Sequence, residues 1–95
     1  MATSAITPGM THDAFADAIY IMLRDVPYGR GEELDSDRIV DYGADNEVRG
    51  IEFLNVSLGV DLTGVPRRDV VENLLRREGI RILGDPNKHM AERIG

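Results

Sequence analysis

Apolar, β-branched and aromatic residues gather in three short runs between residues 18 and 54. The runs at 18–24 (AIYIMLR), 38–42 (RIVDY) and 47–54 (EVRGIEFL) are too short for typical helices, so each predicts a β-strand. A further edge strand is expected within 32–37. The segment 43–46 (GADN) ends in an asparagine, which tolerates the left-handed conformation, and predicts a hairpin between the second and third runs.

The hairpin turn also predicts how its two strands pair. If Gly43 pairs with Glu47, then Asp41 faces Arg49 across the ladder. This register divides the side chains of the hairpin into two groups. One face carries Ile39, Ile51 and Phe53, and the other carries Val40, Tyr42, Val48 and Leu54 together with Glu52. The strand at 18–24 likewise has two apolar faces, so both faces of the sheet are expected to be covered.

One helix is predicted over residues 65–79 (VPRRDVVENLLRREG). Thr63 is the expected N-cap, and Gly79 is expected to end the helix. Its apolar residues form a single stripe that suits packing on a sheet: Val70, Val71, Leu74 and Leu75. A short final strand is expected at 80–83.

These elements predict a small α+β protein, in which an antiparallel meander of three to four strands carries one C-terminal helix on one face. The 95 residues are enough for one domain, expected over 12–83, between a flexible arm (1–11) and a tail or short helix (84–95). A helix of about 13 residues is about 20 Å long and covers one face only. The other apolar face is therefore expected to pack on a second copy, in a homodimer or larger assembly.

Acidic residues are in excess, and the excess lies in the body of the chain. Residues 1–64 hold 12 acids and 4 arginines, residues 65–95 hold 5 acids and 7 basic residues, and the net charge is −6. An acidic body repels phosphate backbones, so nucleic-acid binding is not expected. The charge suits a small basic protein partner, and it also fits ordinary solubilising charge. Four acids are candidates for facing such a partner: Asp35, Asp37, Asp41 and Glu47.

The chain has no cysteine, which excludes disulfides, thiolate metal sites and cysteine nucleophiles, and which fits a cytoplasmic protein. Its N-terminal residues lack the basic start and apolar run of a signal peptide. No stretch approaches the roughly 20 apolar residues that span a bilayer. We therefore expect a soluble cytoplasmic protein that does not contact membranes.

No motif predicts catalysis, and neither a cofactor nor a metal ion is expected. The serines and histidines lack the context of a catalytic triad, and there is no glycine-rich phosphate loop. His12, Asp13 and Asp17 are groups that can bind metals, but their spacing matches no established ligand pattern.

Glu52 is the one acid in a run that otherwise predicts a buried strand. On the predicted register it lies on a mostly apolar face, where Tyr20 or Tyr42 could bring a phenol to it. A functional interpretation is a carboxylate that binds a ligand or exchanges protons in a small pocket. A structural interpretation is a polar residue hydrogen-bonded by neighbouring hydroxyls, the backbone or a dimer partner, which fixes the register. Both remain open from the sequence.

Two blocks, HDAFADAIYIML (12–23) and RIVDYGADNEVRGIEFLNVS (38–57), resemble the YuzE-like bacterial domain of unknown function. The matching positions are Asp13, Ala16, Asp17, Ala18, Ile19, Tyr20, Ile21, Val40, Asp41, Tyr42, Gly50, Ile51, Glu52 and Leu54. The resemblance covers about residues 12–64 and implies a small prokaryotic domain with no established activity. Genes of that family often lie beside those of small toxin-like proteins, which implies an antitoxin-like binding role.

The sequence thus favours a small non-catalytic interaction protein, antitoxin-like, whose partner is a small basic protein. The alternative is a small-molecule binding or enzymatic module that uses Glu52 with Tyr20 or Tyr42.

Overall fold

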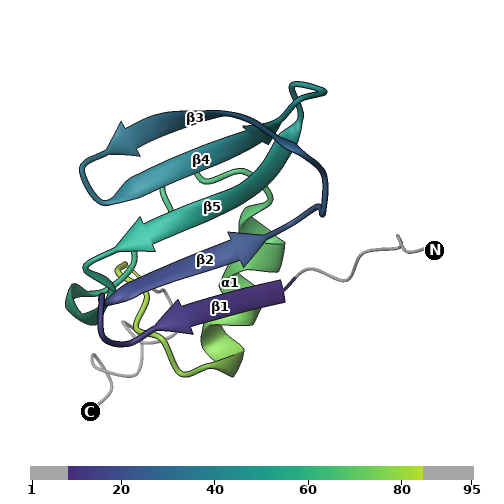
Figure 1. Cartoon of the computed structure of the whole chain (residues 1–95). Coiled ribbons are helices and arrows are strands. Elements are labelled where there is room, and N and C mark those ends of the chain that lie inside the picture. The colour runs from purple at the N-terminus through teal and green to yellow at the C-terminus, as the bar shows by residue number, and fades with distance from the viewer. Residues whose placement is uncertain (1–8, 85–95) are drawn as a thin grey trace, which may run out of the picture.

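The computed structural model describes residues 9–84 and contains one antiparallel five-stranded sheet and one α-helix (Figure 1). The elements in chain order are β1 (Gly9–Asp13), β2 (Ala18–Met22), β3 (Tyr28–Asp35), β4 (Arg38–Gly43), β5 (Val48–Leu54), the 3₁₀ turn η1 (Val56–Leu58) and α1 (Arg68–Arg77). The strand order across the sheet is β1-β2-β5-β4-β3. The predicted α+β class, with one helix on one face, is confirmed. The sheet has five strands, however, instead of the predicted three to four.

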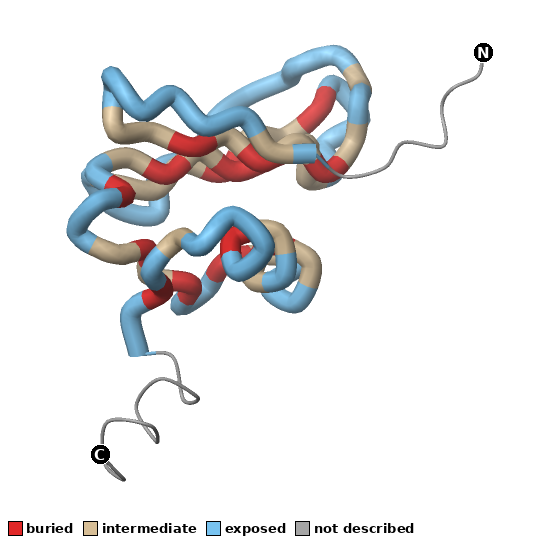
Figure 2. Tube along the Cα trace, turned by 90° about the horizontal axis from the view of Figure 1, so that it is seen from below, coloured by how far each residue is buried: buried red, intermediate tan, exposed pale blue. Residues whose placement is uncertain are grey.

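The hydrophobic core lies between the sheet and a single layer formed by α1 and the segments around it (Figure 2). Alternate residues of β2, β4 and β5 point into this layer, as the period-two geometry of strands requires. The predicted stripe of α1 is confirmed: Val71 and Leu75 are fully buried, and Val70 and Leu74 pack beside them. The buried apolar residues are Ile19, Ile21, Leu23, Val40, Ile51, Phe53, Val56, Val60, Leu62, Val65, Val71, Leu75 and Ile82.

The opposite face of the sheet carries no second layer formed by residues 9–84. We call it the open face, and its half-buried side chains come from the central strands. They are Ala18, Tyr20, Met22, Ile39, Asp41, Glu52 and Leu54.

The pairing of β4 with β5 contains a β-bulge at Arg49. Tyr42 pairs with Val48, as predicted, but Asp41 pairs with Gly50, which leaves Arg49 without a partner on β4. A bulge inserts one extra residue into one strand and bends it locally. The predicted pair between Asp41 and Arg49 is therefore wrong.

Beyond the bulge, the register differs by one residue from the predicted register. Ile39 pairs with Glu52, and Val40 pairs with Ile51. Because directly paired residues share a face, Val40 enters the core and Ile39 lies on the open face. The bulge thus places Val40, Ile51 and Phe53 together on the helix side and leaves Glu52 and Ile39 on the other side.

The hairpin turn itself has the predicted geometry. The Gly43 N–H donates to the Glu47 carbonyl at 2.8 Å, and Asn46 adopts the left-handed conformation with φ 69°. The asparagine therefore fills a position that most side chains disfavour.

The connection from β2 to β3 crosses the ends of β5 and β4, and Arg49 holds it there. The Arg49 carbonyl accepts hydrogen bonds from the N–H groups of Leu23 and Arg24 at 2.8 and 3.0 Å. Its side-chain Nε donates to the Val26 carbonyl at 2.8 Å. The bulge residue is thus bonded to both ends of the crossing segment.

Arg24 fastens the same connection to the hairpin turn. Its Nε donates to the Val48 carbonyl at 2.8 Å, and its two terminal nitrogens donate to the two carboxylate oxygens of Asp45 at 2.9 Å each. This two-bonded arrangement is the strongest geometry for an arginine–carboxylate pair.

Strand β1 was not predicted from the sequence. Residues 9–11 were expected in the flexible arm, but they pair with β2 in an unbroken antiparallel register. Their sequence (GMT) has little strand propensity, so it is the pairing with β2 that makes this segment a strand.

The final strand expected at 80–83 was also wrong. Only Ile82 forms a bridge, with Val60, and that bridge is parallel. The tail segment 85–95 lies outside the described residues.

Helix α1 is shorter at its start than predicted, and Thr63 is not its N-cap. Arg67 occupies the cap position in a left-handed conformation, with φ 53°. Thr63 instead belongs to a loop, where its carbonyl accepts a hydrogen bond from Arg38 and its N–H donates to Asp61. The predicted C-terminal glycine is confirmed, since Gly79 has φ 72°. No helix within residues 9–84 has the length and apolar character needed to cross a membrane.

Strand β3 forms the edge of the sheet beyond β4, and all eight of its residues are exposed. Its pairing with β4 is interrupted twice, between Tyr28 and Arg30 and between Glu33 and Asp35. The predicted edge strand is confirmed, and it is longer than the expected segment 32–37.

Replacing Asp45 with asparagine should destabilise the protein at neutral pH, and the difference should shrink in acid. The hydrogen bonds from Arg24 lower the pKa of Asp45 from 3.8 to about 2. The pKa of Asp45 is lower in the folded state than in the unfolded state, so its ionised carboxylate stabilises the folded protein. That stabilisation is complete above pH 3.8 and is lost as the pH falls through about 2. Urea unfolding midpoints of the wild type and Asp45→Asn, measured from pH 7 to pH 2, check this.

The exposed Asp25 lies in the same connection, and Asp25→Asn serves as a control that should shift the midpoint less at pH 7. A difference for Asp45→Asn that is as large at pH 2 as at pH 7 would contradict the prediction.

Candidate functional site

Glu52 lies on the open face, in the middle of the sheet. Its paired neighbours are Tyr20 on β2 and Ile39 on β4. The residue is half-buried, and its carboxylate makes no hydrogen bond or ion pair with any of residues 9–84. The hydroxyls and backbone of the described residues therefore do not hold this acid.

The Tyr20 hydroxyl is directed to Arg49 and Asp41 instead of Glu52. The ring lies over Gly50, where a Cβ atom would be 2.4 Å from the hydroxyl oxygen. The hydroxyl accepts a hydrogen bond from Arg49 Nη1 at 2.6 Å, and the Asp41 carboxylate lies close enough to the hydroxyl to influence its pKa. Burial, and then the negative charge of Asp41, raise the pKa of Tyr20, so the phenol is neutral at pH 7.

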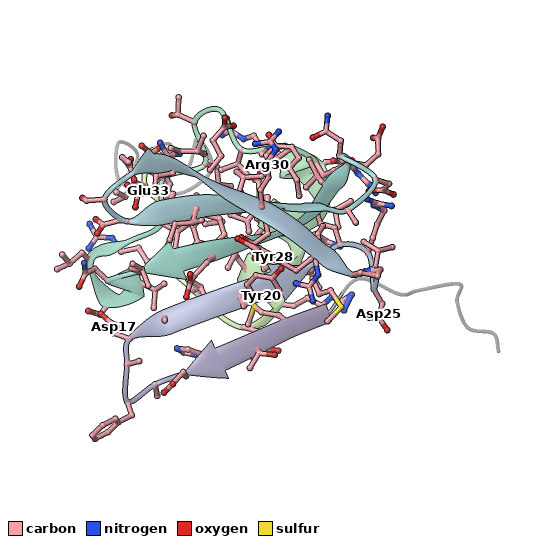
Figure 3. All side chains as sticks on the ribbon, turned by 45° about the horizontal axis from the view of Figure 1, so that its top comes forward. Asp17, Tyr20, Asp25, Tyr28, Arg30 and Glu33 are labelled. Carbon is pink, nitrogen blue, oxygen red and sulfur yellow. The ribbon has the colours of Figure 1, made fainter. Side chains whose placement is uncertain are left out.

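Asp41 stands between two glycines, Gly31 on β3 and Gly50 on β5. A Cβ atom on Gly31 would be 3.1 Å from the Tyr28 hydroxyl and 3.2 Å from Asp41 Oδ1. Tyr28 therefore reaches across Gly31 towards Asp41 from the edge strand, while Tyr20 reaches it across Gly50. Figure 3 shows the two tyrosines on this face.

Arg49 completes this group, which we call the Asp41 cluster (Tyr20, Tyr28, Asp41 and Arg49). Its guanidinium bonds to the Val26 carbonyl and the Tyr20 hydroxyl, both of them neutral acceptors. Within residues 9–84 it forms no ion pair with a carboxylate. Arg49 thus bonds to the Tyr20 hydroxyl and not to Asp41, the residue with which it was predicted to pair.

Tyr42 lies on the other side of the sheet, away from Glu52. Its hydroxyl donates to Glu32 at 3.4 Å, and the Arg30 guanidinium lies 4.3 Å from the centre of its ring. The bulge at Arg49 is the reason, because it reverses the face assigned to Tyr42 relative to Glu52. Of the two tyrosines predicted to lie near Glu52, only Tyr20 is its cross-strand neighbour, and the Tyr20 hydroxyl bonds to Arg49.

The four acids predicted to face a partner do not form one patch. Asp35 and Asp37 lie at the β3–β4 turn, Glu47 lies at the β4–β5 turn, and Asp41 lies on the open face. The two turns are at opposite ends of β4, because consecutive antiparallel connections alternate between the ends of a sheet. Asp41 alone belongs to the candidate site.

Asp35 and Asp37 are also engaged within the protein. A hollow of about 200 Å³ includes both acids and Arg38 in its lining. Arg38 pairs with Asp35 at 3.0 Å and donates to the Asp61 carbonyl at 3.0 Å, while the Asp37 carboxylate accepts from the Asn55 amide at 2.8 Å. This end of the sheet joins the β3–β4 turn to the loop before α1.

Asp13 and Asp17, which were considered as metal ligands, accept hydrogen bonds from nearby residues of the protein. Asp17 accepts hydrogen bonds from the backbone and hydroxyl of Ser57, and Asp13 accepts one from the Ala16 N–H. Residues 9–84 contain no group of three histidines or acids placed to hold a metal ion.

The sequence did not point to Tyr28 or Phe15. Tyr28 stands between Pro27 and Gly29, a context that predicts a chain break and gives no strand face. Phe15 lies in the β1–β2 turn and is fully exposed. An exposed aromatic in a turn has no periodic signal from which to infer its surroundings.

Replacing Gly50 with alanine should destabilise the protein by about 1–3 kcal/mol, the usual cost of overpacking. The new methyl group would lie 2.4 Å from both the Ile21 carbonyl oxygen and the Tyr20 hydroxyl. Gly9→Ala, on the same cross-strand row, meets nothing within 4 Å and is the matched control. Chemical denaturation of both variants measures the effect, and equal stability of the two would contradict the clash.

Replacing Glu52 with glutamine should leave the free energy of unfolding within about 0.5 kcal/mol of the wild type, as for a surface substitution. The carboxylate has no partner among residues 9–84, so glutamine removes a charge without breaking a bond. A loss of 1–3 kcal/mol, the cost of an unsatisfied buried group, would restore the structural interpretation. Thermal and urea unfolding, performed with a determination of the oligomeric state, distinguish these outcomes.

Comparison with protein families places the sheet within a family whose activity is unknown. The model of the family "Protein of unknown function (DUF2283)" matches residues 10–57, about half of the chain. The match runs from β1 to η1 and includes every residue of the Asp41 cluster, while α1 lies beyond it. Comparisons with curated proteins and with solved structures gave no significant match. The chain belongs to the DUF2283 family of proteins of unknown function.

Proposed function

We propose that this protein is a non-catalytic interaction protein and that its open face binds a small basic protein. The observation that carries the proposal is the combination of apolar area and unpaired negative charge on a face that residues 9–84 leave uncovered. Large uncovered apolar area on a small soluble domain is typical of an interaction surface.

The apolar part of the surface comes from the central strands. Tyr20, Met22, Ile39 and Leu54 are half-buried side chains of the open face, and Tyr28 adds an aromatic ring that is 58% exposed. Tyrosine is enriched among the residues that contribute most to binding in protein interfaces.

The charge on this face is not neutralised within the described chain. Asp41, Glu52 and Glu33 form no ion pair with any of residues 9–84. Ion pairs occur instead at the turns, on the helix and on the other face of the sheet, as in Arg24–Asp45, Arg76–Glu72 and Arg30–Glu32. A partner with basic side chains would supply the missing positive charge, and such complementarity gives specificity and fast association.

A second copy of the chain fits this face less well than a basic partner does. Stacking two open faces would bring their acidic residues towards each other, and like charges across an interface are unfavourable. The homodimer expected from the sequence remains a prediction. We favour the basic partner for the open face.

The resemblance to the YuzE-like domain suggests which kind of basic protein the open face binds. We include in the proposal that the basic partner is a small toxin-like protein, which the bound chain would neutralise in the manner of an antitoxin. The net charge of −6 is compatible with this role.

The alternative function is a small-molecule binding or enzymatic module in which Glu52 acts with Tyr20. The pairing of these residues on adjacent strands supports it. In that case Glu52→Gln would abolish binding of the small molecule while leaving the fold unchanged.

The test is a pull-down with the tagged protein from a lysate of its own organism, at low and moderate salt. The proposal predicts stoichiometric recovery of one small basic protein. Glu52→Lys should abolish that recovery, because it reverses a charge at the centre of the open face. Glu78→Lys, at the exposed C-terminal end of α1, makes the same change on the other layer and should retain the partner.

Two results would contradict the proposal. One is recovery of the same protein by both lysine variants, which would place binding away from the open face. The other is recovery of nothing but copies of the chain itself, which would indicate that the open face binds a second copy of the chain.

A further inference from the structure

We propose that Asp41, flanked by Tyr20 and Tyr28, is the position at which the open face receives a cationic side chain, and that the preferred group is the guanidinium of an arginine. The inference rests on the proposed function for the identity of the partner as a basic protein. It adds the position of the anchor and the chemistry of the group that it binds.

The backbone creates the space for this site. One cross-strand row of the open face reads Gly9, Met22, Gly50, Asp41 and Gly31 from β1 to β3. Asp41 therefore has a glycine on each side, and no side chain of its own row encloses it on adjacent strands. Glycine in a strand interior often marks a close approach of another group to the backbone. Here the groups that approach are the two phenols.

The Asp41 carboxylate has capacity for further hydrogen bonds. Its side chain is half-buried, lies near the Tyr20 hydroxyl, and makes no ion pair within residues 9–84. An ionised carboxylate offers about four acceptor sites, which suits a two-bonded guanidinium. A partly buried negative charge with unused acceptor sites is a favourable position for a cation.

The two tyrosines add aromatic rings beside the carboxylate. Cations are attracted to the face of such a ring, and arginine is the side chain that most often uses this interaction. Tyr28 is the accessible one of the pair, at 58% exposure. The neutral Tyr20 phenol lies over Gly50, on the other side of Asp41 from Gly31.

The protein already uses this chemistry on its other face. There the Arg30 guanidinium lies 4.3 Å from the centre of the Tyr42 ring, and Glu32 lies beside both, 3.9 Å from Arg30 and 3.4 Å from the Tyr42 hydroxyl. A tyrosine and a carboxylate on neighbouring strands thus hold a guanidinium within this fold. Tyr28 and Asp41 present the same two groups on the open face, with no guanidinium between them among residues 9–84.

Arg49 places a positive charge near the site, but its guanidinium is committed elsewhere. It bonds to the Val26 carbonyl and the Tyr20 hydroxyl, and it lies 5.8 Å from the centre of the Tyr20 ring. Asp41, Glu52 and Glu33 together outweigh its charge on this face. The surface is therefore set for a cation and not for an anion such as phosphate.

The test is a titration of the ¹⁵N-labelled full chain, followed by NMR, with N-acetyl-arginine amide as the probe. The citrulline analogue has nearly the same shape without the charge and is the ligand control. We expect concentration-dependent shifts of the Gly31 and Gly50 amides with the arginine probe and none with citrulline. Asp41→Asn should weaken binding about tenfold, because it removes the charge that receives the guanidinium.

Glu47→Gln is the matched variant, since it removes one negative charge at the hairpin turn, and it should bind like the wild type. The same spectra show whether each variant is folded. The inference is overturned if Asp41→Asn and Glu47→Gln bind equally, if the probe leaves both glycine amides unchanged, or if inorganic phosphate shifts them and arginine does not.

The inference and the proposed function can fail separately. Shifts that depend on Asp41, combined with a pull-down that recovers no basic protein, would support the site and contradict the partner. A basic protein that is lost with Glu52→Lys but bound normally by folded Asp41→Asn would support the partner and contradict the site.

Discussion

The bulge at Arg49 is the constraint on which the arrangement of the rest of the sheet depends. It shifts the β4–β5 register so that Val40 joins Ile51 in the core while Asp41 and Glu52 turn to the open face. The same residue bonds the connection that crosses from β2 to β3, through both its carbonyl and its guanidinium. Because that guanidinium also bonds to the Tyr20 hydroxyl, the residue that sets the fold also positions the candidate site. Bulges are over-represented next to functional sites for this reason, since they redirect side chains.

The parts of the fold that could be predicted are those with strong local signals. The runs at 18–24, 38–42 and 47–54 have branched and aromatic residues between turn residues, and all three are strands. Strand β1 could not be predicted, because its stability comes from pairing and not from its own residues. The order of the strands depends on the pairing of β2 with β5, which are far apart in the chain and are joined by no turn motif.

The candidate site could be predicted only in part, and the bulge explains much of the difference. Glu52 and Tyr20 could be paired on one face, because period-two alternation holds along β2 and along β5 after the bulge. Tyr42 could not be assigned, since one extra residue at Arg49 reverses its face relative to Glu52. Asp41 was identified by its charge alone, as one of four acids predicted to face a partner. The strand topology places these four acids in different parts of the sheet. Its position between two glycines and two tyrosines depends on contacts across four strands, β2 to β5, which no local pattern encodes.

The two edges of the sheet differ, and this limits how copies of the chain could associate. Edge-to-edge addition of identical sheets continues without end when β1 of one molecule pairs with β3 of the next, and such open-ended contacts produce fibres. Strand β3 opposes this, because its ladder is interrupted twice and its exposed residues include the charged Arg30, Glu32 and Glu33. Bulges and charges at an edge are the features by which natural sheets avoid aggregation. The fold can therefore expose a whole sheet face for binding without offering an edge at β3 for polymerisation.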